Sequence, residues 1–350
     1  MNYKENLMKY WTPHINEVEP IEHKEPAYDI SVLIPVYNAM PYLEECIRSL
    51  LEQEIDNIKV EVICINNIST DNSMKYLLSV KDKLKDKFSN VTFGDCKVAG
   101  AAAARNMALC LSSGEHVLFV DADDKLGSKT YLKDLFTGLK ENDADACLEN
   151  FTCFNNERQV LKTITLGQGI KTDYKDFKSV LGYTANKLIK RAKFEGINFP
   201  EQLWFEDSII QTLVFPRCHK VVFLDKADYW YRLHENSLTS SKNSTARSLE
   251  AVWVADWVYK QARGKGILDA VDKGQWFEAY SCYFGSLTFN RIKKRPGIER
   301  RAAYHVLNEL MKESMSYCNY KGQLRSDSKA CLQSYLAWEI ECLKVIVRKR

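Results

Sequence analysis

Three carboxylates lie close together in the run Asp121-Ala122-Asp123-Asp124, which directly follows the apolar segment 116–120. Like charges at this spacing repel one another, so a bound cation would stabilise them. Carboxylate oxygens are hard ligands, and Mg²⁺ or Mn²⁺ commonly bridges one or two of them to phosphate oxygens. An isolated run of this kind can equally be a solvated loop in which Asp123 or Asp124 caps a helix. The run therefore predicts a divalent-metal site, with a purely structural alternative.

The segment that leads to these carboxylates alternates short apolar strands with amphipathic helices. Strands are predicted at residues 30–34, 60–65, 91–93 and 116–120, and helices near 41–51, 74–78 and 100–113. This order is typical of an α/β fold with a mostly parallel sheet covered by helices on both faces. Ligands bind at the carboxyl ends of the strands in such sheets. Polar residues 37–38, 66–71 and 121–124 follow three of these strands, which predicts a binding site at that edge.

The second half of the chain shows a different pattern. Strands are predicted at 144–154, 160–166 and 220–233, and a loop followed by a helix from near Glu206 is predicted within 199–218. Beyond the polar run 240–244 the apolar spacing becomes helical. We therefore predict an N-terminal extension over 1–28, an α/β domain over 29–240 and a helical region over 241–350.

The composition is that of an ordinary globular protein and excludes several classes. A formal net charge of +3 over 350 residues does not suggest a nucleic-acid-binding protein, which usually has a strongly basic domain. No run approaches the roughly 20 apolar residues of a membrane span, and the polar N-terminus lacks the apolar core of a secretory signal. The eleven cysteines form no CxxC pair, so we expect buried, reduced thiols and a cytoplasmic location.

Five motifs in a fixed order carry a family resemblance. They are DISVLIPVYNAMPYLEECIRSLLEQ, VICINNISTDNS, GAAAARNMALCLSSGEHVLFVDADD, ANKLIKRAKFEGINFPEQLWFEDSIIQTLVF and YWYRLHENSLTSS. Together they resemble the family-two inverting glycosyltransferases of GT-A fold over roughly residues 29–240. The resemblance implies a nucleotide-sugar half over 29–125 and an acceptor half over 126–240. It says nothing about residues 241–350.

The resemblance also implies which residues hold the donor and its metal ion. The nucleotide base would lie against Pro35, Val36 and Tyr37, with Arg105 near the donor and Asp121, Ala122 and Asp123 at the pyrophosphate and a Mn²⁺ or Mg²⁺ ion. A tyrosine face can stack on a base, although a Tyr37 packed in the core is the structural alternative. For Arg105, the alternative is a surface cation on its helix. Asp124 would orient the loop or join the metal site.

One departure from the family pattern concerns the base. Asn66-Asn67-Ile68 stands where members usually have two aspartates and a glycine, the first aspartate accepting a hydrogen bond from uracil. Asn66 can also accept, but its amide donates as well and carries no charge. A UDP-sugar is still the expected donor, but the residue that would bind the uracil ring is not the aspartate usual in the family. Ile68 replaces a residue that readily takes a positive φ, so the loop is expected to run differently.

On the acceptor side, the resemblance implies that Asp207 is the base that removes the proton from the attacking hydroxyl. Glu206 would be its neighbour, holding the acceptor or raising the pKa of Asp207. The structural alternative is that both acids only stabilise a helix N-terminus. Trp204 is expected either to stack on an acceptor sugar or to fill the core. His234 would complete the metal shell, and Arg232 or Lys187 would neutralise the pyrophosphate.

The predicted function is metal-dependent, inverting transfer of a hexose or N-acetylhexosamine from a nucleoside diphosphate sugar to a glycan or glycolipid hydroxyl, as in polysaccharide biosynthesis. A catalytically silent nucleotide- or carbohydrate-binding module on the same fold is the alternative, motivated by Asn66. A nucleotidyltransferase ranks lower, because residues 35–38 do not form the glycine-rich basic loop that it would need.

The helical region 241–350 leaves two interpretations open. It combines an apolar stripe, which includes Leu249, Val252 and Trp253, with a basic cluster over 291–301. Basic charge beside aromatic residues can bind anionic lipid headgroups, which would place the protein peripherally at the inner face of the membrane. An ordinary helical subdomain that packs on the α/β domain or forms a homodimer is the simpler interpretation.

Overall fold

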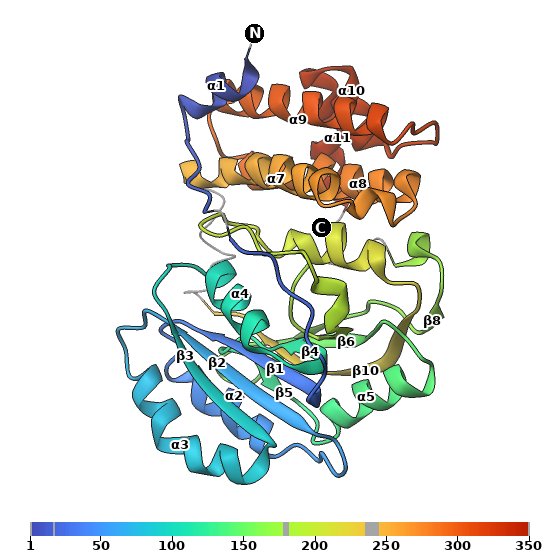
Figure 1. The fold of residues 1–350 in the computed structure, drawn as a ribbon. Helices are drawn as coiled ribbons and strands as arrows, with labels where there is room; N and C mark the ends of the chain where they lie inside the picture. Colours follow the sequence, from blue (N-terminus) through green and yellow to red (C-terminus); the bar gives the residue numbers. More distant parts are fainter. Residues whose placement is uncertain (1, 17, 178–181, 235–244, 349–350) are drawn as a thin grey trace. The chain divides into compact units, whose positions relative to one another are not determined.

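The computed structural model describes residues 2–16, 18–177, 182–234 and 245–348 of the chain (Figure 1). The chain forms two compact units. The sheet unit consists of Glu17–Glu201 and Cys218–His234, and the helical unit consists of Met1–Asn16, Gln202–Arg217 and Glu235–Arg350. The predicted N-terminal extension is thus divided between the two units. The boundary predicted near residue 240 lies outside the described residues.

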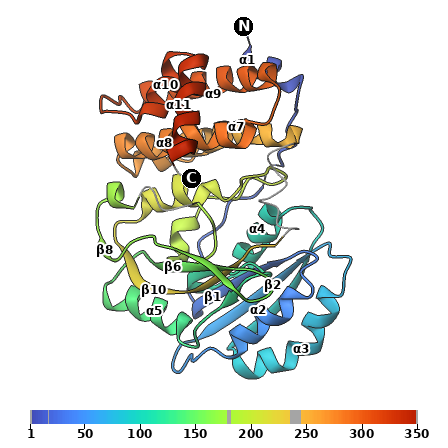
Figure 2. The same cartoon turned by 180° about the vertical axis from the view of Figure 1, so that it is seen from behind.

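One sheet of ten described strands forms the sheet unit, in the order β3-β2-β1-β4-β9-β6-β10-β5, with β7 beside β6 and β8 beside β10. The strands are β1 (Tyr28–Val36), β2 (Val60–Asn67), β3 (Asn90–Cys96), β4 (Gly114–Phe119), β5 (Lys125–Leu126), β6 (Ala146–Phe154), β7 (Val160–Ile164), β8 (Gly169–Lys171), β9 (Lys187–Lys190) and β10 (Val221–Arg232). The first four are parallel to one another, whereas β9 runs antiparallel to both β4 and β6. Figure 2 shows β6 and β10, which pair in parallel, from behind.

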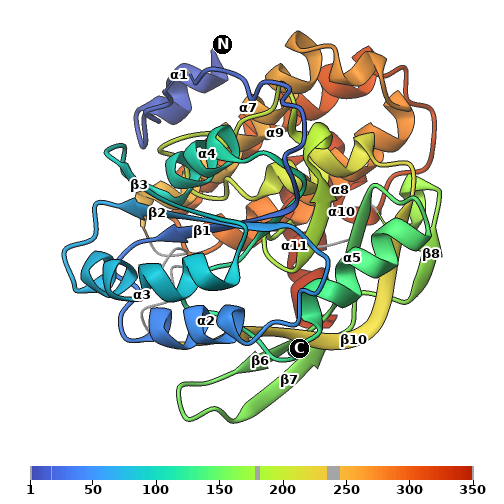
Figure 3. The ribbon, with the colours of Figure 1, turned by 60° about the horizontal axis from the view of Figure 1, so that its bottom comes forward.

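The helices of the sheet unit cover both faces of the parallel strands (Figure 3). They are α2 (Tyr42–Leu51), α3 (Ser73–Lys87), α4 (Ala101–Leu111) and α5 (Tyr131–Glu141), with short 3₁₀ turns at Tyr174–Asp176 and Arg191–Phe194. Alternate residues such as Ile30, Val32 and Ile34 share a core with α2 and α3. The opposite face packs on α4, whose Met107 lies close to Gly94 of β3. Full burial on both faces explains why these strands are continuous apolar runs.

The predicted strands and helices of the first 120 residues are confirmed, as is the antiparallel pair 144–154 and 160–166, seen as β6 and β7. Helix α5 and strand β9 have no predicted counterpart. The buried positions Tyr131, Leu132, Leu135 and Leu139 do follow a helical spacing, so the signal for α5 is present in the sequence. Strand β9 has four residues, and its extended form depends on pairing with β4 and β6.

The helical unit contains six α-helices among its described residues. They are α1 (Tyr3–Met8), α7 (Glu250–Gly264), α8 (Lys273–Ile292), α9 (Gly297–Tyr317), α10 (Ser326–Gln333) and α11 (Tyr335–Arg348), with shorter turns at Ile210–Val214, Phe215–Arg217, Ala246–Leu249 and Ile267–Asp269. The predicted apolar stripe is buried here, as Val252 and Trp253 show. In the predicted basic cluster, Arg295 pairs with Glu299 and Arg300 with Glu339. Within the described residues, no helix has both the length and the apolar character that a membrane span requires.

Candidate active site

The acidic run sits at the carboxyl end of β4, beside the ends of β1 and β2. In the parallel register, Leu33 of β1 lies opposite Phe119 of β4, and Val36 lies opposite Asn66 of β2. The chain then turns, and the backbone N–H of Asp124 donates to the carbonyl of Asp121 at 3.0 Å. Strand ends that align in this way bring the polar residues after each strand to one edge, as the sequence predicts.

Asp124 points into the fold rather than toward this edge. Its side chain is fully buried and accepts hydrogen bonds from the Tyr229 hydroxyl and the Arg232 backbone N–H, both at 2.7 Å. Burial, followed by the charges of Asp123 and Asp121, raises the pKa of Asp124 well above its usual range. Asp124 thus joins the loop to β10. Of the two roles left open for it, the structure supports the orienting one.

Asp123 and His234 meet at the surface of the sheet unit. Nε2 of His234 lies 3.0 Å from Oδ2 of Asp123, and the Asp123 side chain is 38% exposed. The imidazole ring packs against the Tyr42 ring, with 4.9 Å between centroids. Its other nitrogen, Nδ1, is buried and has no hydrogen-bond partner among the described residues. A histidine and an aspartate 111 residues apart in sequence are therefore paired directly with each other at this edge.

The Asp123 oxygen and the His234 nitrogen would suit a divalent ion whose other ligands include phosphate oxygens. Within the described part of the chain, no group of three His, Cys, Asp or Glu side chains could hold a metal ion. An imidazole nitrogen and a carboxylate oxygen are both ligands that divalent ions take in proteins, and those of His234 and Asp123 lie 3.0 Å apart. Mixed nitrogen and oxygen ligands suit Mn²⁺ better than Mg²⁺. The site is therefore suited to an ion that takes its remaining ligands from a diphosphate and water.

Arg105 is the cation nearest to the other outward-facing carboxylate. One of its guanidinium nitrogens, Nη2, lies 3.2 Å from Oδ1 of Asp121, and its side chain is 8% exposed. Its position on α4 is fixed partly by Phe199, whose ring centre lies 5.8 Å from the guanidinium carbon. Arg105 is thus a buried cation at the acidic edge, and the surface-cation alternative is wrong.

Arg232 and Lys187 are buried in the sheet unit. Arg232 donates from Nε to the Asp123 carbonyl at 2.7 Å, and it forms an ion pair with Glu45 of α2. Its guanidinium carbon lies 4.3 Å from the centre of the Phe154 ring. Lys187 donates to the carbonyls of Tyr183 and Ala185 at 2.8 and 3.1 Å. The Arg232 side chain therefore binds the acidic turn at the Asp123 backbone carbonyl. The sequence pattern did not predict this role.

At the end of β2, the Asn66 amide is held in one orientation. Its Nδ2 donates to Oδ1 of Asp95 at 2.7 Å, and its Oδ1 accepts from the Ser69 N–H at 3.3 Å. A carboxylate can only accept and an N–H can only donate, so the two partners fix which end of the amide is which. This end of β2 therefore presents side-chain oxygens that accept hydrogen bonds, from Asn66 and from the exposed Asp95. Asp95 was not among the predicted site residues.

Neighbouring residues complete this edge. Tyr37 is 60% exposed at the end of β1, which excludes the core-packing alternative. Pro35 is partly exposed, whereas Val36 and Ala122 are buried and can meet a ligand only through their backbone. Ile68 takes φ 51°, so the loop keeps the left-handed conformation that we expected it to lose. That expectation was wrong because the surrounding hydrogen bonds override the preference of the side chain.

Glu149 is linked to the acidic turn through Tyr229. The Tyr229 backbone N–H donates to Glu149, and the Tyr229 hydroxyl donates to Asp124. Glu149 is fully buried in β6, and its Oε1 accepts from the backbone N–H groups of Asp228 and Tyr229 at 2.5 and 2.9 Å. These residues lie where the register of β10 shifts against β6. Burial, followed by the charge of Asp228, raises the pKa of Glu149 to about 8. Oε2 has no partner among the described residues.

Because Glu149 binds its proton more tightly in the folded state, its contribution to stability is fully present below its unfolded pKa of about 4.5 and is lost as pH rises through about 8. Glu149→Gln is expected to weaken this dependence, since its Oε1 can accept both N–H groups without a charge. Urea unfolding at pH 5 and pH 8 should show a difference in unfolding free energy that is smaller by about 1–3 kcal/mol in the variant. Parallel pH profiles for wild type and variant would contradict this, and the exposed Glu141→Gln controls for charge loss.

The second acidic pair lies in the helical unit. Glu206 and Asp207 are partly exposed and follow Phe205, which takes φ 70°. The backbone N–H of Ile210 donates to the Asp207 carbonyl at 3.0 Å, so Asp207 stands at the first turn of a short helix. Trp204 is partly exposed, and the guanidinium carbon of Arg247 lies 4.5 Å from its ring centre. The two acids and the tryptophan thus share one short segment of the helical unit.

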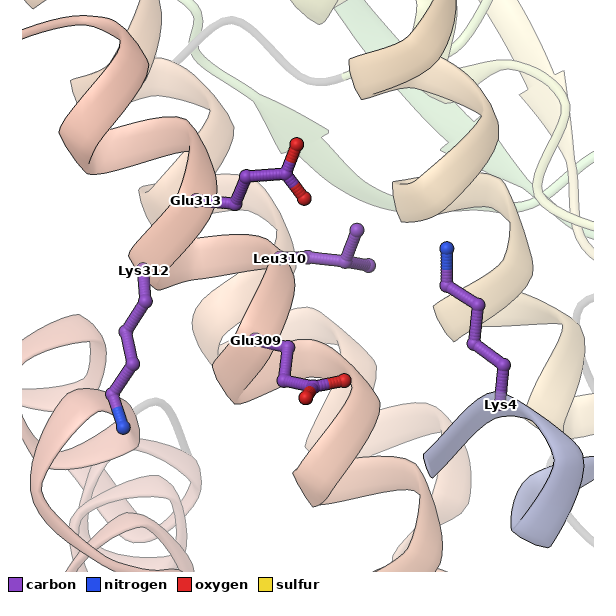
Figure 4. Close-up of a pocket in the computed structure, with 5 residues that line it drawn as sticks. All are labelled: Lys4, Glu309, Leu310, Lys312 and Glu313. Carbon is purple, nitrogen blue, oxygen red and sulfur yellow. The ribbon is translucent and has the colours of Figure 1, made fainter. Parts of the chain in front are cut away.

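A hollow of about 530 Å³ also lies in the helical unit, between α1 and α9 (Figure 4). It is lined by Lys4, Glu309, Leu310, Lys312 and Glu313, and Lys4 is already bonded to Asp256 at 2.6 Å. In Figure 4 the Lys312 side chain points away from Lys4. None of the predicted site residues lines this hollow.

Comparison with known families places the strand-end site in context. Residues 31–197 match the family model described as Glycosyl transferase family 2. This match covers just under half of the chain. The matched residues include the acidic run, Asn66 and Arg105, and they end before Asp207 and His234.

Two curated relatives of this chain are glycosyltransferases by name. It is 32% identical over 207 residues to poly(ribitol-phosphate) beta-glucosyltransferase of Bacillus spizizenii, an alignment that covers 58% of this chain and 32% of that protein. It is 27% identical over 240 residues to glycosyltransferase GlyG of Streptococcus pneumoniae, covering 64% of this chain and 78% of that protein. The chain therefore spans about a third of the first relative's length.

A solved structure matches beyond the family domain. The crystal structure of S. aureus TarS 1–349 in complex with UDP-GlcNAc superposes with a TM-score of 0.68 and 20% sequence identity, covering 90% of this chain and 89% of that one. At this identity the likeness shows the fold. It confirms the predicted GT-A fold with a C-terminal helical region.

Proposed function

We propose that this chain is a metal-dependent, inverting glycosyltransferase that moves a hexose or N-acetylhexosamine from a UDP-sugar to a hydroxyl of a glycan or glycolipid. The names of its relatives support the sugar classes, since one is a beta-glucosyltransferase and another is the beta-N-acetylglucosaminyltransferase TarS of Staphylococcus aureus. Both names specify poly(ribitol phosphate), which is therefore the first acceptor to test. The TarS complex with UDP-GlcNAc supports a uridine donor.

The observation that carries this proposal is the pairing at the strand ends. The nitrogen and oxygen donors of His234 and Asp123 stand beside the Arg105–Asp121 ion pair. A donor diphosphate needs cations along its oxygens and a metal that bridges them. When bound, the metal would neutralise the charge that develops on the departing nucleoside diphosphate. Asp123 and His234 would hold it, and Arg105 would contribute a fixed positive charge nearby.

Asp207 is the proposed base, which acts on the acceptor hydroxyl. An inverting transfer needs one carboxylate that takes the proton of the acceptor hydroxyl as its oxygen attacks the anomeric carbon. The bond from that carbon to the diphosphate oxygen breaks on the opposite side, and the electron pair leaves with the nucleoside diphosphate. Glu206 would hold a second acceptor hydroxyl. Trp204, partly exposed beside them, would offer a flat face to an acceptor sugar.

The proposal is tested with a donor panel. Purified protein is incubated with UDP-glucose, UDP-GlcNAc, GDP-mannose and a CMP-sugar, with and without poly(ribitol phosphate), in Mn²⁺, Mg²⁺ or EDTA. We expect release of UDP that requires a divalent ion, and a product whose anomeric configuration by NMR is opposite to that of the donor. Nucleotide binding without metal dependence or turnover would favour the catalytically silent module instead.

The side-chain oxygens of Asn66 and Asp95 accept hydrogen bonds, and this predicts which nucleotide base is bound. The uracil ring carries an N–H where cytosine has an acceptor nitrogen, so acceptor oxygens favour UDP over CDP. In Asp95→Ala the Asn66 amide loses the partner that fixes its orientation. Calorimetry in Mn²⁺ should show UDP binding weakened about 10-fold and a smaller UDP-to-CDP preference. An unchanged preference would contradict this role, and Asp86→Asn on α3 is the matched exposed control.

A further inference from the structure

The segment that carries the proposed base holds a costly backbone conformation. Phe205 has φ 70°, in the left-handed region that is a genuine outlier for a bulky side chain. Such a conformation is unfavourable and persists only where its surroundings impose it. The turn nevertheless sets the direction in which the next two residues, Glu206 and Asp207, leave it. The contacts that impose this turn therefore also decide where Asp207 points.

The first contact is made by Glu250, the first residue of α7. Its carboxylate is 1% exposed, and Oε2 accepts from the Trp204 backbone N–H at 2.6 Å. Oε1 accepts from Nε of Arg247 at 2.9 Å. Nη2 of Arg247 reaches back to the carbonyl of Gln202 at 3.0 Å. One buried carboxylate and one guanidinium thus hold the backbone on the N-terminal side of Phe205.

The second contact is made by Arg291 of α8. Its guanidinium carbon lies 3.9 Å from the centre of the Phe205 ring, and its Nη2 donates to the Tyr283 hydroxyl at 3.0 Å. Tyr283 is 4% exposed, and burial together with the charges of Asp207 and Glu206 raises its pKa to about 12, against the opposing effect of Arg291. The two acids are therefore close enough to act on the hydroxyl that Arg291 holds.

Helix α8 also holds the chain beyond the acidic pair. Nε1 of Trp276, whose side chain is fully buried, donates to the Thr212 carbonyl at 2.7 Å. The short helix after Asp207 is thus fixed to the same helix as Arg291. These contacts explain why Gln202–Arg217 belongs to the helical unit, although the sheet unit contains the chain on both sides of it.

We propose that Glu250 and Arg291 are positioning residues for Asp207, so that contacts within the helical unit set the direction of the proposed base. The inference rests on the proposed role of Asp207 as the base. Glu250 fixes the backbone before the left-handed turn, and Arg291 fixes the aromatic ring at the turn. Both residues act on the direction of Asp207 without contacting the donor.

The test uses the full chain and the variants Glu250→Ala, Glu250→Gln and Arg291→Met. We expect Glu250→Ala and Arg291→Met to lower kcat for UDP-sugar transfer about 10- to 100-fold, with the donor KM within about 2-fold of wild type. Glu250→Gln should recover most of the loss, because its Oε1 can still accept the Trp204 N–H. Amide hydrogen exchange over residues 203–210 should accelerate in the alanine variant and much less in the glutamine variant.

The matched control is Asp327→Asn, which changes another fully buried carboxylate of the helical unit, one that accepts from the Ser328 N–H at 2.8 Å. It should leave exchange over 203–210 and kcat unchanged. If Glu250→Ala and Arg291→Met match this control in kcat or in exchange, the inference is wrong. If wild type transfers no sugar, the proposed function fails, and the exchange measurement still decides whether Glu250 and Arg291 hold the turn. Should Glu250→Ala fail to fold, Glu250→Gln and Arg291→Met decide both points.

Discussion

Replacing Asp207 with asparagine is expected to slow sugar transfer about 10³-fold while donor binding stays close to that of wild type. The amide has the size and shape of the carboxylate but cannot take the proton from the acceptor hydroxyl. Donor binding should persist because the proposed donor ligands, Asp121, Asp123 and Arg105, belong to the sheet unit, whereas Asp207 belongs to the helical unit. The effect should therefore fall on kcat rather than on the dissociation constant of UDP.

The measurement compares initial rates of transfer with calorimetric binding of UDP in Mn²⁺. Asp269→Asn is the matched control, because it removes a carboxylate whose side chain is 67% exposed in the same unit. Glu206→Gln should reduce transfer less than Asp207→Asn does, since Glu206 is assigned to acceptor binding. If UDP affinity falls in parallel with the rate in Asp207→Asn, then Asp207 serves the donor and is not the base.

A second large effect is expected at the metal-binding pair. Asp123→Ala and His234→Ala should each weaken the affinity for Mn²⁺ in the presence of UDP about 100-fold, and transfer should fall accordingly. With two protein donors in the proposed shell, loss of either leaves the ion held almost entirely by the diphosphate. The residual binding of UDP in EDTA should be unchanged, because it depends on the side chains of Asn66 and Asp95.

Manganese titrations followed by electron paramagnetic resonance give the metal affinity directly, independently of turnover. Asp86→Asn on α3 again controls for the loss of a surface carboxylate. Equal Mn²⁺ affinity in wild type and Asp123→Ala would show that the ion, if required, binds elsewhere. Equal loss of UDP binding in EDTA would instead indicate that the substitution has disturbed the acidic turn itself.

Much of the secondary structure of the sheet unit can be predicted from local sequence patterns. The strands β1, β2 and β4 are buried on both faces, so each is a short apolar run that is visible without a structure. The position of Asp121 follows from the same logic, since a polar residue after such a strand must lie at its carboxyl end. Strand β9 escaped prediction because its extended form is imposed by two partners, β4 and β6, rather than by its own four residues.

The acidic run and the family resemblance predicted a site, but they left open which of its carboxylates would face outward. The orientation of these carboxylates depends on β10. The buried Asp124 accepts a hydrogen bond from the hydroxyl of Tyr229, which lies 105 residues later in the chain. Asp123 meets His234 across a similar separation of 111 residues. In the same way, the orientation of Asn66 depends on Asp95 of the neighbouring strand. None of these pairings leaves a periodic signal in the sequence.

By itself, the sequence determined the order of strands and helices, the acidic strand end and the family of the domain, because these depend on near neighbours in the chain and on ordered motifs. Only the tertiary structure decided which carboxylates face outward, how the Asn66 amide is oriented, and which unit carries Asp207. The physical reason is that burial and hydrogen-bond partners are set by contacts between segments far apart in sequence. The left-handed turn at Phe205 and its contacts with Glu250 and Arg291 show this most directly.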